Sequence, residues 1–198
     1  MRFKMVLVIS AMGLIGGALS ACNNTSADEP LTQEEMIARG EHLVRVGDCG
    51  ICHTPKIMSE RGPIEDSSML FSGHLASDPI PEYPGDFFAG SGWIAATNPS
   101  MTAWAGPWGI SFASNLTPHQ VYGSGAWTET SFIQAMRNGQ HLGQGRPILP
   151  PMPWQAISHQ SDEDLKAMFA YFKSIRPIEN QVPQPIPPPA APKAAAGE

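Results

Sequence analysis

Two cysteines and a histidine carry the clearest chemistry in this chain, and they stand together in Cys49-Gly50-Ile51-Cys52-His53. Two thiols three positions apart can form thioether bonds to the two vinyl groups of one porphyrin, and a histidine directly after them is placed to ligate its iron. The spacing therefore predicts one covalently bound haem c, attached through Cys49 and Cys52, with His53 as the proximal axial ligand.

Two other uses of a Cys-x-x-Cys pair fit the sequence less well. A structural zinc site needs four ligands, and the sequence has no second pair of this kind. A thioredoxin-like dithiol needs strands and helices that alternate around it, and the sequence pattern does not show them. Covalent haem is therefore the interpretation that we adopt.

The ligand on the other side of the iron decides between an electron carrier and a haem that binds a small molecule. Met152 lies among prolines in Pro150-Pro151-Met152-Pro153, and such a stiff loop can hold a thioether on iron at little ordering cost. We predict Met152 as the distal ligand, the alternative being a methionine that only fills space. The other candidates, each with a surface or packing role as its alternative, are Met101, His74, His119, His141 and His159.

The N-terminus is typical of an export signal. Arg2 and Lys4 precede an apolar run, which ends in Leu19-Ser20-Ala21-Cys22 and resembles the lipobox of bacterial lipoproteins. The resemblance implies a signal peptide over residues 1–21, lipidation of Cys22 and a tether over 22–30, with an ordinary signal peptide or an uncleaved anchor as the alternative. The mature protein would then be exported, periplasm-facing and lipid-anchored to a bacterial membrane.

These assignments use all 3 cysteines of the 198-residue chain, so none remains for a disulfide. The formal net charge of −6 becomes −8 when residues 1–21 are removed, because Arg2 and Lys4 are lost with them. An acidic surface argues against nucleic-acid binding, and it is compatible with a redox partner that carries a basic patch.

Capping signals and apolar spacing predict three helices. Their ranges and N-cap residues are 31–46 with Thr32, 129–137 with Thr128, and 162–175 with Ser161. Between the first two lies a long stretch, 55–127, which is rich in Gly, Pro, Ser and Trp. We expect an irregular insert there, with short elements such as a hairpin around 92–102. The predicted domain covers 31–178, and the Pro/Ala-rich tail over 179–198 is expected to be disordered.

Several motifs together resemble a known family. They are Cys49-Gly50-Ile51-Cys52-His53-Thr54-Pro55, Ser114-Asn115-Leu116-Thr117-Pro118, Gly125-Ala126-Trp127-Thr128-Glu129, Arg137-Asn138-Gly139, Pro150-Pro151-Met152-Pro153-Trp154 and Ser161-Asp162-Glu163-Asp164-Leu165. Through them the chain resembles the class I, single-haem cytochrome c superfamily over roughly residues 31–185. More narrowly, it resembles the cytochrome c domains of membrane-bound bacterial dehydrogenase cytochrome subunits, such as those of alcohol and gluconate dehydrogenases.

The resemblance implies an all-α cytochrome c fold, in which N- and C-terminal helices cross around one covalently bound haem. Gly40, Phe169 and Phe172 would form the crossing, and Trp127 and the turn at 115–118 would pack beside the haem. It also implies His53 and Met152 as the two axial ligands. Those dehydrogenase subunits carry three haem motifs and this chain carries one, so a stand-alone carrier is the simpler inference.

The predicted function is that of a one-electron carrier without enzymatic activity, acting in a bacterial respiratory or periplasmic dehydrogenase chain. The electron donor would be a membrane or periplasmic dehydrogenase, and the acceptor a terminal oxidase or another cytochrome. The alternative is a peroxidase-like haem enzyme or small-molecule-binding haem protein with an open distal site, to which Arg146 and His141 could contribute polar groups.

Overall fold

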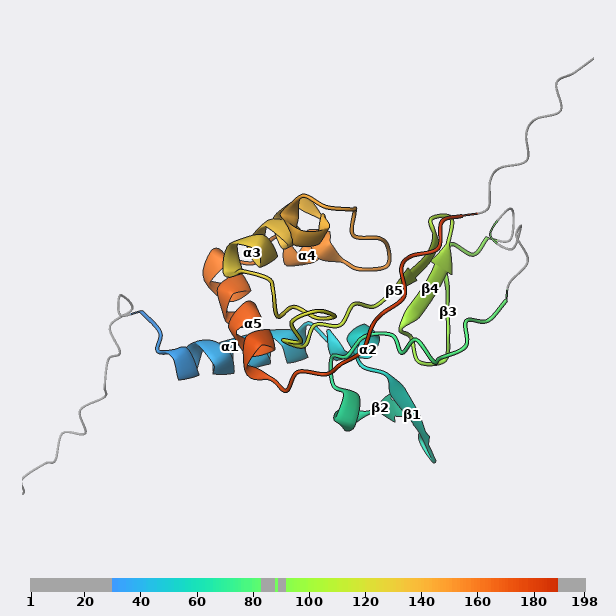
Figure 1. Ribbon diagram of the computed structural model, residues 1–198, viewed down its shortest axis with the longest axis horizontal. Helices are drawn as coiled ribbons and strands as arrows, with labels where there is room; N and C mark the ends of the chain where they lie inside the picture. Colours follow the sequence, from blue (N-terminus) through green and yellow to red (C-terminus); the bar gives the residue numbers. More distant parts are fainter. Residues whose placement is uncertain (1–29, 83–87, 89–91, 189–198) are drawn as a thin grey trace, which may run out of the picture. The chain divides into compact units, whose positions relative to one another are not determined.

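The computed structural model describes residues 30–82, 88 and 92–188, and those from Leu31 to Pro188 belong to one compact unit. The predicted signal peptide and Cys22 lie outside the described residues. The helices of this unit, with two 3₁₀ turns (η), are α1 (Gln33–Val46), α2 (Gly50–His53), η1 (Ser67–Met69), α3 (Glu129–Asn138), η2 (His141–Gly143), α4 (Trp154–Ile157) and α5 (Asp162–Ser174) (Figure 1).

The three helices expected from their capping signals are confirmed. Thr32 caps α1 and forms a capping box with Glu35, Thr128 caps α3, and Ser161 caps α5. Each cap satisfies backbone N–H groups that the first turn of a helix leaves without an intrahelical partner. Because these signals are local, they could be read without knowledge of the fold.

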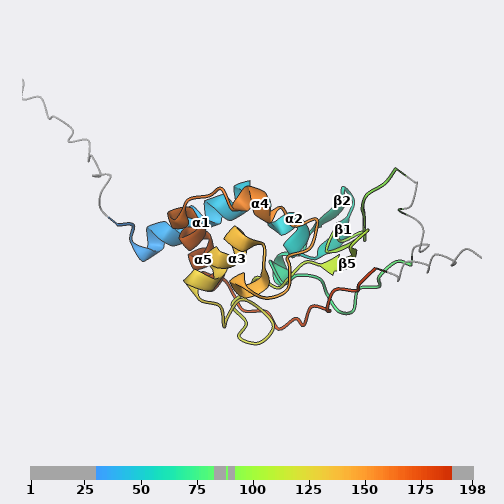
Figure 2. The same ribbon diagram turned by 90° about the horizontal axis from the view of Figure 1, so that it is seen from above.

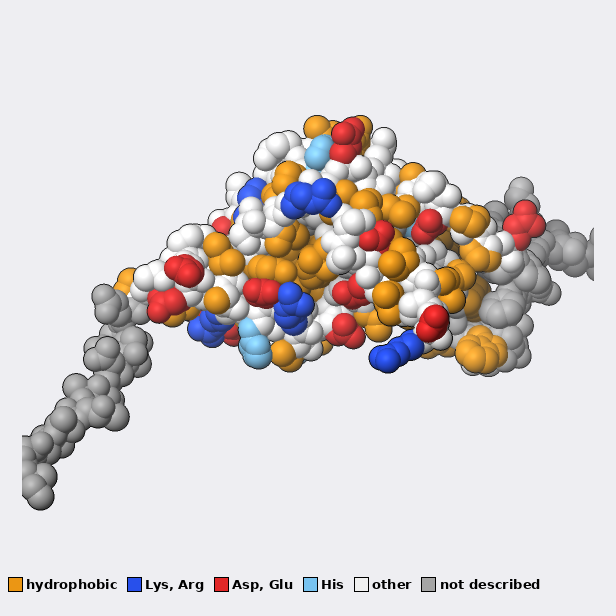
Figure 3. Space-filling view, turned by 90° about the horizontal axis from the view of Figure 1, so that it is seen from below, with side chains coloured by type: hydrophobic (Ala, Val, Ile, Leu, Met, Phe, Trp, Pro, Cys, Tyr) orange, Lys and Arg blue, Asp and Glu red, His pale blue; other side chains and the backbone are white. Residues whose placement is uncertain are grey.

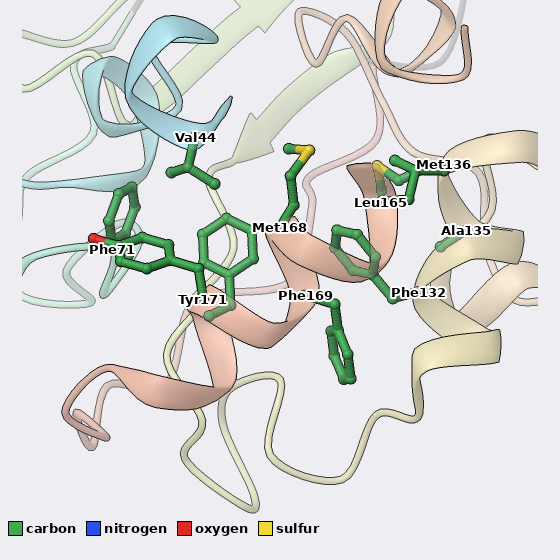
Figure 4. Packing of buried hydrophobic residues seen from close by; sticks show 10 residues of the cluster. Val44, Phe71, Phe132, Ala135, Met136, Leu165, Met168, Phe169 and Tyr171 are labelled. Carbon is green, nitrogen blue, oxygen red and sulfur yellow. The ribbon is translucent and has the colours of Figure 1, made fainter. Parts of the chain in front are cut away.

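Helix α5 packs against both α1 and α3, and the three helices lie together in both ribbon views (Figures 1 and 2). Their apolar faces, together with Phe71 of the insert, build the first hydrophobic cluster (Figure 4), whose buried members are Val44, Phe71, Phe132, Ala135, Met136, Leu165, Met168, Phe169, Tyr171 and Phe172. The rings of Phe132 and Phe169 stack with centroids 5.3 Å apart. Burial of each large side chain of this kind stabilises the fold by about 1.5–3 kcal/mol.

The predicted all-α fold is wrong, because the insert folds into two antiparallel sheets and the protein is a mixed α/β fold. One sheet pairs β1 (Lys56–Ser59) with β2 (Gly62–Glu65). The other has the order β3-β4-β5, from β3 (Ala96–Thr97), β4 (Ala103–Gly106) and β5 (Gly109–Phe112). Gly62 and Gly109 close the two hairpins at φ of +100° and +92°, a backbone conformation that other residues adopt only at a cost.

The segment that follows α5, which we call the C-terminal strap (residues 176–188), runs back along the insert. Ile186 exchanges two backbone hydrogen bonds with Ile110 of β5, at 2.8 and 2.9 Å. The side-chain amide of Asn180 donates to the carbonyls of Ser72 and His74, at 2.8 and 2.9 Å. The tail expected over 179–198 therefore makes fixed contacts over its first ten residues, 179–188, and residues 189–198 lie outside the described part.

A second, smaller hydrophobic cluster lies under the three-stranded sheet, with Ala103, Ile110 and Phe112 as its buried members. The β1–β2 hairpin is more open, since Ile57, Met58 and Ile64 are all exposed. The face on the β1–β2 side mixes hydrophobic with acidic and basic side chains (Figure 3). In the described part of the chain, every helix is too short or too polar to cross a membrane.

Candidate functional site

The two cysteines and the histidine of the motif are held by one short helical turn. Cys49 is the N-cap residue of α2, and His53 is its last residue. Lys56, three residues beyond the last residue of the helix, folds back so that its ammonium group donates to the carbonyls of Gly50, Ile51 and Thr54, at 3.2, 2.9 and 2.6 Å. A cation on the free carbonyls at a helix C-terminus stabilises the turn. Lys56 was not among the predicted site residues, although a lysine just past a helical turn is a recognisable signal.

His53 is buried, and one of its ring nitrogens is already engaged. Its Nδ1 atom lies 2.8 Å from the carbonyl oxygen of Ser114, which can only accept, so Nδ1 carries the proton and donates. Burial lowers the pKa of the imidazole, which favours the neutral ring. A neutral histidine whose Nδ1–H is held by a carbonyl presents Nε2 to a metal, as metal-binding histidines commonly do.

Ser114 is fixed in turn by a buried hydrogen-bond network around Asn115. The Oδ1 atom of Asn115 accepts from the backbone and the hydroxyl of Thr117, at 3.0 and 2.7 Å. Its Nδ2 atom donates to the carbonyls of Ile178 and Asn180 in the C-terminal strap, at 2.9 and 3.2 Å. The orientation of His53 thus depends on the strap, although no residue of the strap was a candidate in the sequence.

The two thiols lie in an apolar environment that keeps them protonated. Burial raises the pKa of Cys49 to about 11, and burial also raises the pKa of Cys52. Reactive redox cysteines show the opposite behaviour, because a dithiol catalyst depends on a lowered pKa. The thiols therefore do not have the character of a thioredoxin-like pair. Cys49 also packs against the first hydrophobic cluster.

Met152 reaches the same cluster from the other end of the chain, on the loop between α3 and α4. Three contacts fix this loop. Ile148 donates its backbone N–H to the carbonyl of Gly139, at 2.8 Å, and the ring of Trp154 packs where a Cβ of Gly139 would stand. The hydroxyl of Ser111 in β5 donates to the carbonyl of Pro150, at 2.5 Å. Cys49 and Met152 both pack against this cluster, as do Leu116 and Trp127.

The other candidates for the distal ligand lie in different parts of the fold. Met101 is in the turn between β3 and β4, where its carbonyl accepts from the indole of Trp104. His74 is fully buried and its ring contacts Phe112 of the second cluster. His119 stacks on Tyr122, His141 lies against Trp127, and His159 is exposed. In the described part of the chain, no three His, Cys, Asp or Glu side chains group as ligands for a metal ion.

The donor set and its surroundings fit a c-type haem. Two thiols and a neutral, oriented histidine share one helical turn, and a thioether from a braced loop packs against the same hydrophobic cluster as Cys49. These are the attachment groups, axial donors and dry environment that such a cofactor requires.

No known family model matches the chain. It is 28% identical over 177 residues to the cytochrome c subunit of alcohol dehydrogenase (quinone) from Gluconobacter oxydans. The matched segment is 88% of this chain and 28% of the relative. It is 27% identical over 183 residues to the gluconate 2-dehydrogenase cytochrome c subunit of Pantoea cypripedii, a match to 89% of this chain and 32% of the relative. It is 26% identical over 188 residues to the fructose dehydrogenase cytochrome subunit of Gluconobacter japonicus, a match to 93% of this chain and 31% of the relative.

The chain spans about a third of the length of these relatives. The likeness nevertheless extends over most of this chain, including the haem motif, the insert and the Met152 loop. The chain is therefore a homologue of the cytochrome c subunits of bacterial dehydrogenases.

Proposed function

We propose that this protein is a one-electron carrier that holds a single haem c, bound by thioethers to Cys49 and Cys52 and ligated by His53 and Met152. The observation that carries the proposal is the hydrogen bond from Nδ1 of His53 to the carbonyl of Ser114, at 2.8 Å. It fixes the imidazole in the tautomer that offers Nε2 to iron, directly after the two cysteines that would attach the porphyrin.

When bound, the haem supplies an iron that accepts and releases one electron. The chain contributes a rigid and dry environment for it. The network at Asn115 keeps His53 in one orientation, and the contacts of Ile148 and Pro150 hold the loop that carries Met152. Since neither ligand has to move when the charge on the iron changes, little reorganisation accompanies electron transfer. Thioether ligation raises the reduction potential, as a carrier in a respiratory chain requires.

The relatives named above are subunits of alcohol, gluconate and fructose dehydrogenases. By analogy, the donor of this protein is a dehydrogenase of the bacterial membrane or periplasm, and the acceptor is a terminal oxidase or another cytochrome. The carrier itself performs no substrate chemistry. Its acidic net charge suits a partner with a basic docking surface.

We place the protein on the periplasmic side of a bacterial membrane, anchored by lipid on Cys22. The sequence around this cysteine supports the proposal. Replacing it, Cys22→Ser, should abolish the incorporation of a radiolabelled fatty acid that we expect in the wild-type protein, with an unchanged haem spectrum. Absence of label from the wild-type protein, or equal labelling of Cys22→Ser, would contradict lipidation at this residue.

The proposed function is tested by the optical spectra of the exported, purified protein in its oxidised and reduced forms. A low-spin spectrum with the weak red sulfur-to-ferric-iron band, and haem that resists extraction by acidic organic solvent, is the expected result. The Cys49→Ala and Cys52→Ala variants should each lose one thioether. A high-spin ferric spectrum without the red band would instead indicate an open iron, and the peroxidase-like alternative would replace the carrier.

A further inference from the structure

The β1–β2 hairpin of the insert packs directly against the helical turn that carries the haem motif. Lys56 of β1 donates to carbonyls of that turn, including those of Gly50 and Ile51. Glu65 of β2 pairs with Lys56 across the hairpin, and its carboxylate occupies the space where a Cβ of Gly50 would stand. The hairpin therefore borders the proposed haem attachment site.

The hairpin and the turn together leave apolar side chains open to solvent. Side chains alternate between the two faces of a strand, so Met58 and its partner Pro63 share the hairpin face from which Lys56 and Glu65 reach the turn. Met58 is 76% exposed, and Ile51, which stands between the two cysteines, is 40% exposed. Pro63 is exposed as well. We call Ile51, Met58 and Pro63 the hairpin patch.

The open charge beside the hairpin patch is mostly negative. Asp48, Glu60 and Glu65 are exposed, and among the described residues none of the three takes part in a salt bridge. Of the two basic residues of the hairpin, Lys56 is held by backbone carbonyls and Arg61 stands exposed at the turn. Figure 3 shows this side of the molecule, where acidic side chains stand among hydrophobic ones.

This charge restricts what the hairpin patch can bind. Two copies of the chain would bring like charges together, which is unfavourable at an interface. Anionic lipid headgroups attract basic segments, and this surface is acidic. A protein that carries Lys or Arg around an apolar contact fits both the charge and the exposed side chains. The small size of the patch is typical of short-lived encounters between electron-transfer proteins.

We propose that the hairpin patch, with Asp48 and Glu65 beside it, is the docking surface for a basic redox protein that exchanges electrons with the haem. This inference rests on the proposed function, because it requires the haem to be bound. The acidic groups steer the partner toward the surface, and the apolar side chains hold it there. Since electron tunnelling weakens steeply with distance, a partner beside the turn of Cys49 and Cys52 is well placed for transfer.

The test is the rate of electron transfer from the reduced holoprotein to oxidised pseudoazurin, a basic blue copper protein whose absorption is separate from that of haem. Stopped-flow measurements give the second-order rate constant at low and at high ionic strength. In Asp48→Asn and in Glu65→Gln it should fall about 2- to 5-fold at low ionic strength, since steering as a whole accelerates association about 10-fold or more. At high ionic strength the difference from the wild type should vanish, because salt screens exposed charges.

The matched control is Glu34→Gln, which changes the net charge equally in the first turn of α1. About 18 Å of helix separates this position from the end of α1 that precedes Asp48, so its rate constants should equal those of the wild type. A shift in reduction potential would change the rate at both ionic strengths, and the salt dependence therefore distinguishes docking from driving force. Met58→Gln should slow transfer at both ionic strengths while its haem spectrum and reduction potential stay unchanged.

Wild-type rates in Asp48→Asn, Glu65→Gln and Met58→Gln, with covalent haem present in all of them, would overturn the inference and leave the proposed function standing. The inference is also overturned if Met58→Gln turns a dimer into a monomer in sedimentation equilibrium, or abolishes binding to phosphatidylglycerol vesicles, because the patch would then serve a second copy or a membrane. If the wild-type protein carries no covalent haem, the proposed function fails and this inference fails with it.

Discussion

Gly40 of α1 lies so close to Ala167 of α5 that a Cβ on the glycine would stand 1.9 Å from the alanine carbonyl oxygen. The obstacle is backbone and cannot rotate away. Alanine normally stabilises a helix by about 1 kcal/mol relative to glycine, but here the clash opposes that gain. Gly40→Ala should therefore lower the free energy of unfolding by about 1–3 kcal/mol, the usual cost of overpacking.

Chemical denaturation measures this difference, and Ala38→Ser provides the comparison. Ala38 is exposed on the same helix, so one added heavy atom there meets solvent and costs only the difference in helix propensity, about 0.5 kcal/mol. A Gly40→Ala variant as stable as the wild type would show that α1 and α5 can move apart without a loss of stability.

Met152 is the residue whose replacement most directly tests the carrier. Met152→Ala removes the thioether that we propose as the distal ligand, so the red sulfur–iron band should disappear and the reduction potential should fall. The control is Met58→Ala, since Met58 is 76% exposed on the β1–β2 hairpin. Spectra and potentials of Met58→Ala should match those of the wild type. An intact red band in Met152→Ala would assign the distal position to another residue, with Met101 as the next methionine to replace.

The hydrogen bond from Ser111 to the carbonyl of Pro150, at 2.5 Å, joins the insert to the Met152 loop. A bond of this kind contributes about 0.5–1.5 kcal/mol net, so in Ser111→Ala added imidazole should displace the methionine about 2- to 10-fold more readily. Spectrophotometric titration with imidazole measures this affinity. Ser174→Ala is the control, because among the described residues the Ser174 hydroxyl bonds within α5, to the carbonyl of Tyr171. Equal imidazole affinity in the Ser111→Ala variant and the wild type would mean that the loop is held by its other contacts.

The sequence predicted the parts of this protein whose signals are local. The start of each long helix is marked within its first turn by a capping residue, namely Thr32 with Glu35, Thr128 and Ser161. The spacing of Cys49, Cys52 and His53 likewise indicates haem attachment without any knowledge of the tertiary structure. The hairpin expected around 92–102 overlaps the β3–β4 pair, but the other strand pairs were missed, although they are local hairpins, because their strands are short and carry little pattern. Strands β4 and β5 are only four residues long, consist largely of small residues, and depend on the distant Ile186 for a further partner.

The supporting groups of the site escaped the sequence analysis for a related reason. His53 is oriented by the carbonyl of Ser114, and a backbone acceptor has no residue type by which it could be recognised. Asn115 was expected only to pack beside the haem, whereas its amide bonds to carbonyls of the C-terminal strap. That strap follows a proline-rich pattern, which composition alone describes as extended or disordered.

His74 predicts a pH dependence of stability. It is fully buried, its Nδ1 atom is 2.8 Å from the hydroxyl of Thr102, and its Nε2 atom has no hydrogen-bond partner among the described residues. Desolvation lowers its pKa, and the negative charge of Asp78 offsets this only in part. In the unfolded chain an imidazole binds a proton near pH 6.5, whereas the folded protein resists the same protonation until a lower pH. Stability is therefore complete above about pH 6.5 and falls as the pH drops below it, by at most about 1.4 kcal/mol per pH unit for this one group.

His74→Gln keeps a polar partner for Thr102 but cannot titrate, so its unfolding free energy should fall less steeply with decreasing pH than that of the wild type. Urea denaturation at several pH values between 7.5 and 5, roughly the range over which this linkage acts, gives the two slopes. His53 and His141 also have lowered pKa values. Because they contribute equally to the slope of the wild type and to that of His74→Gln, the difference between the two slopes reports on His74 alone. Gln160→Ala, at an exposed position without a titratable group, should retain the wild-type slope. If His74→Gln does so too, the buried imidazole is protonated in the folded state as easily as in the unfolded one, and a water or a rearranged Asp78 must then satisfy Nε2.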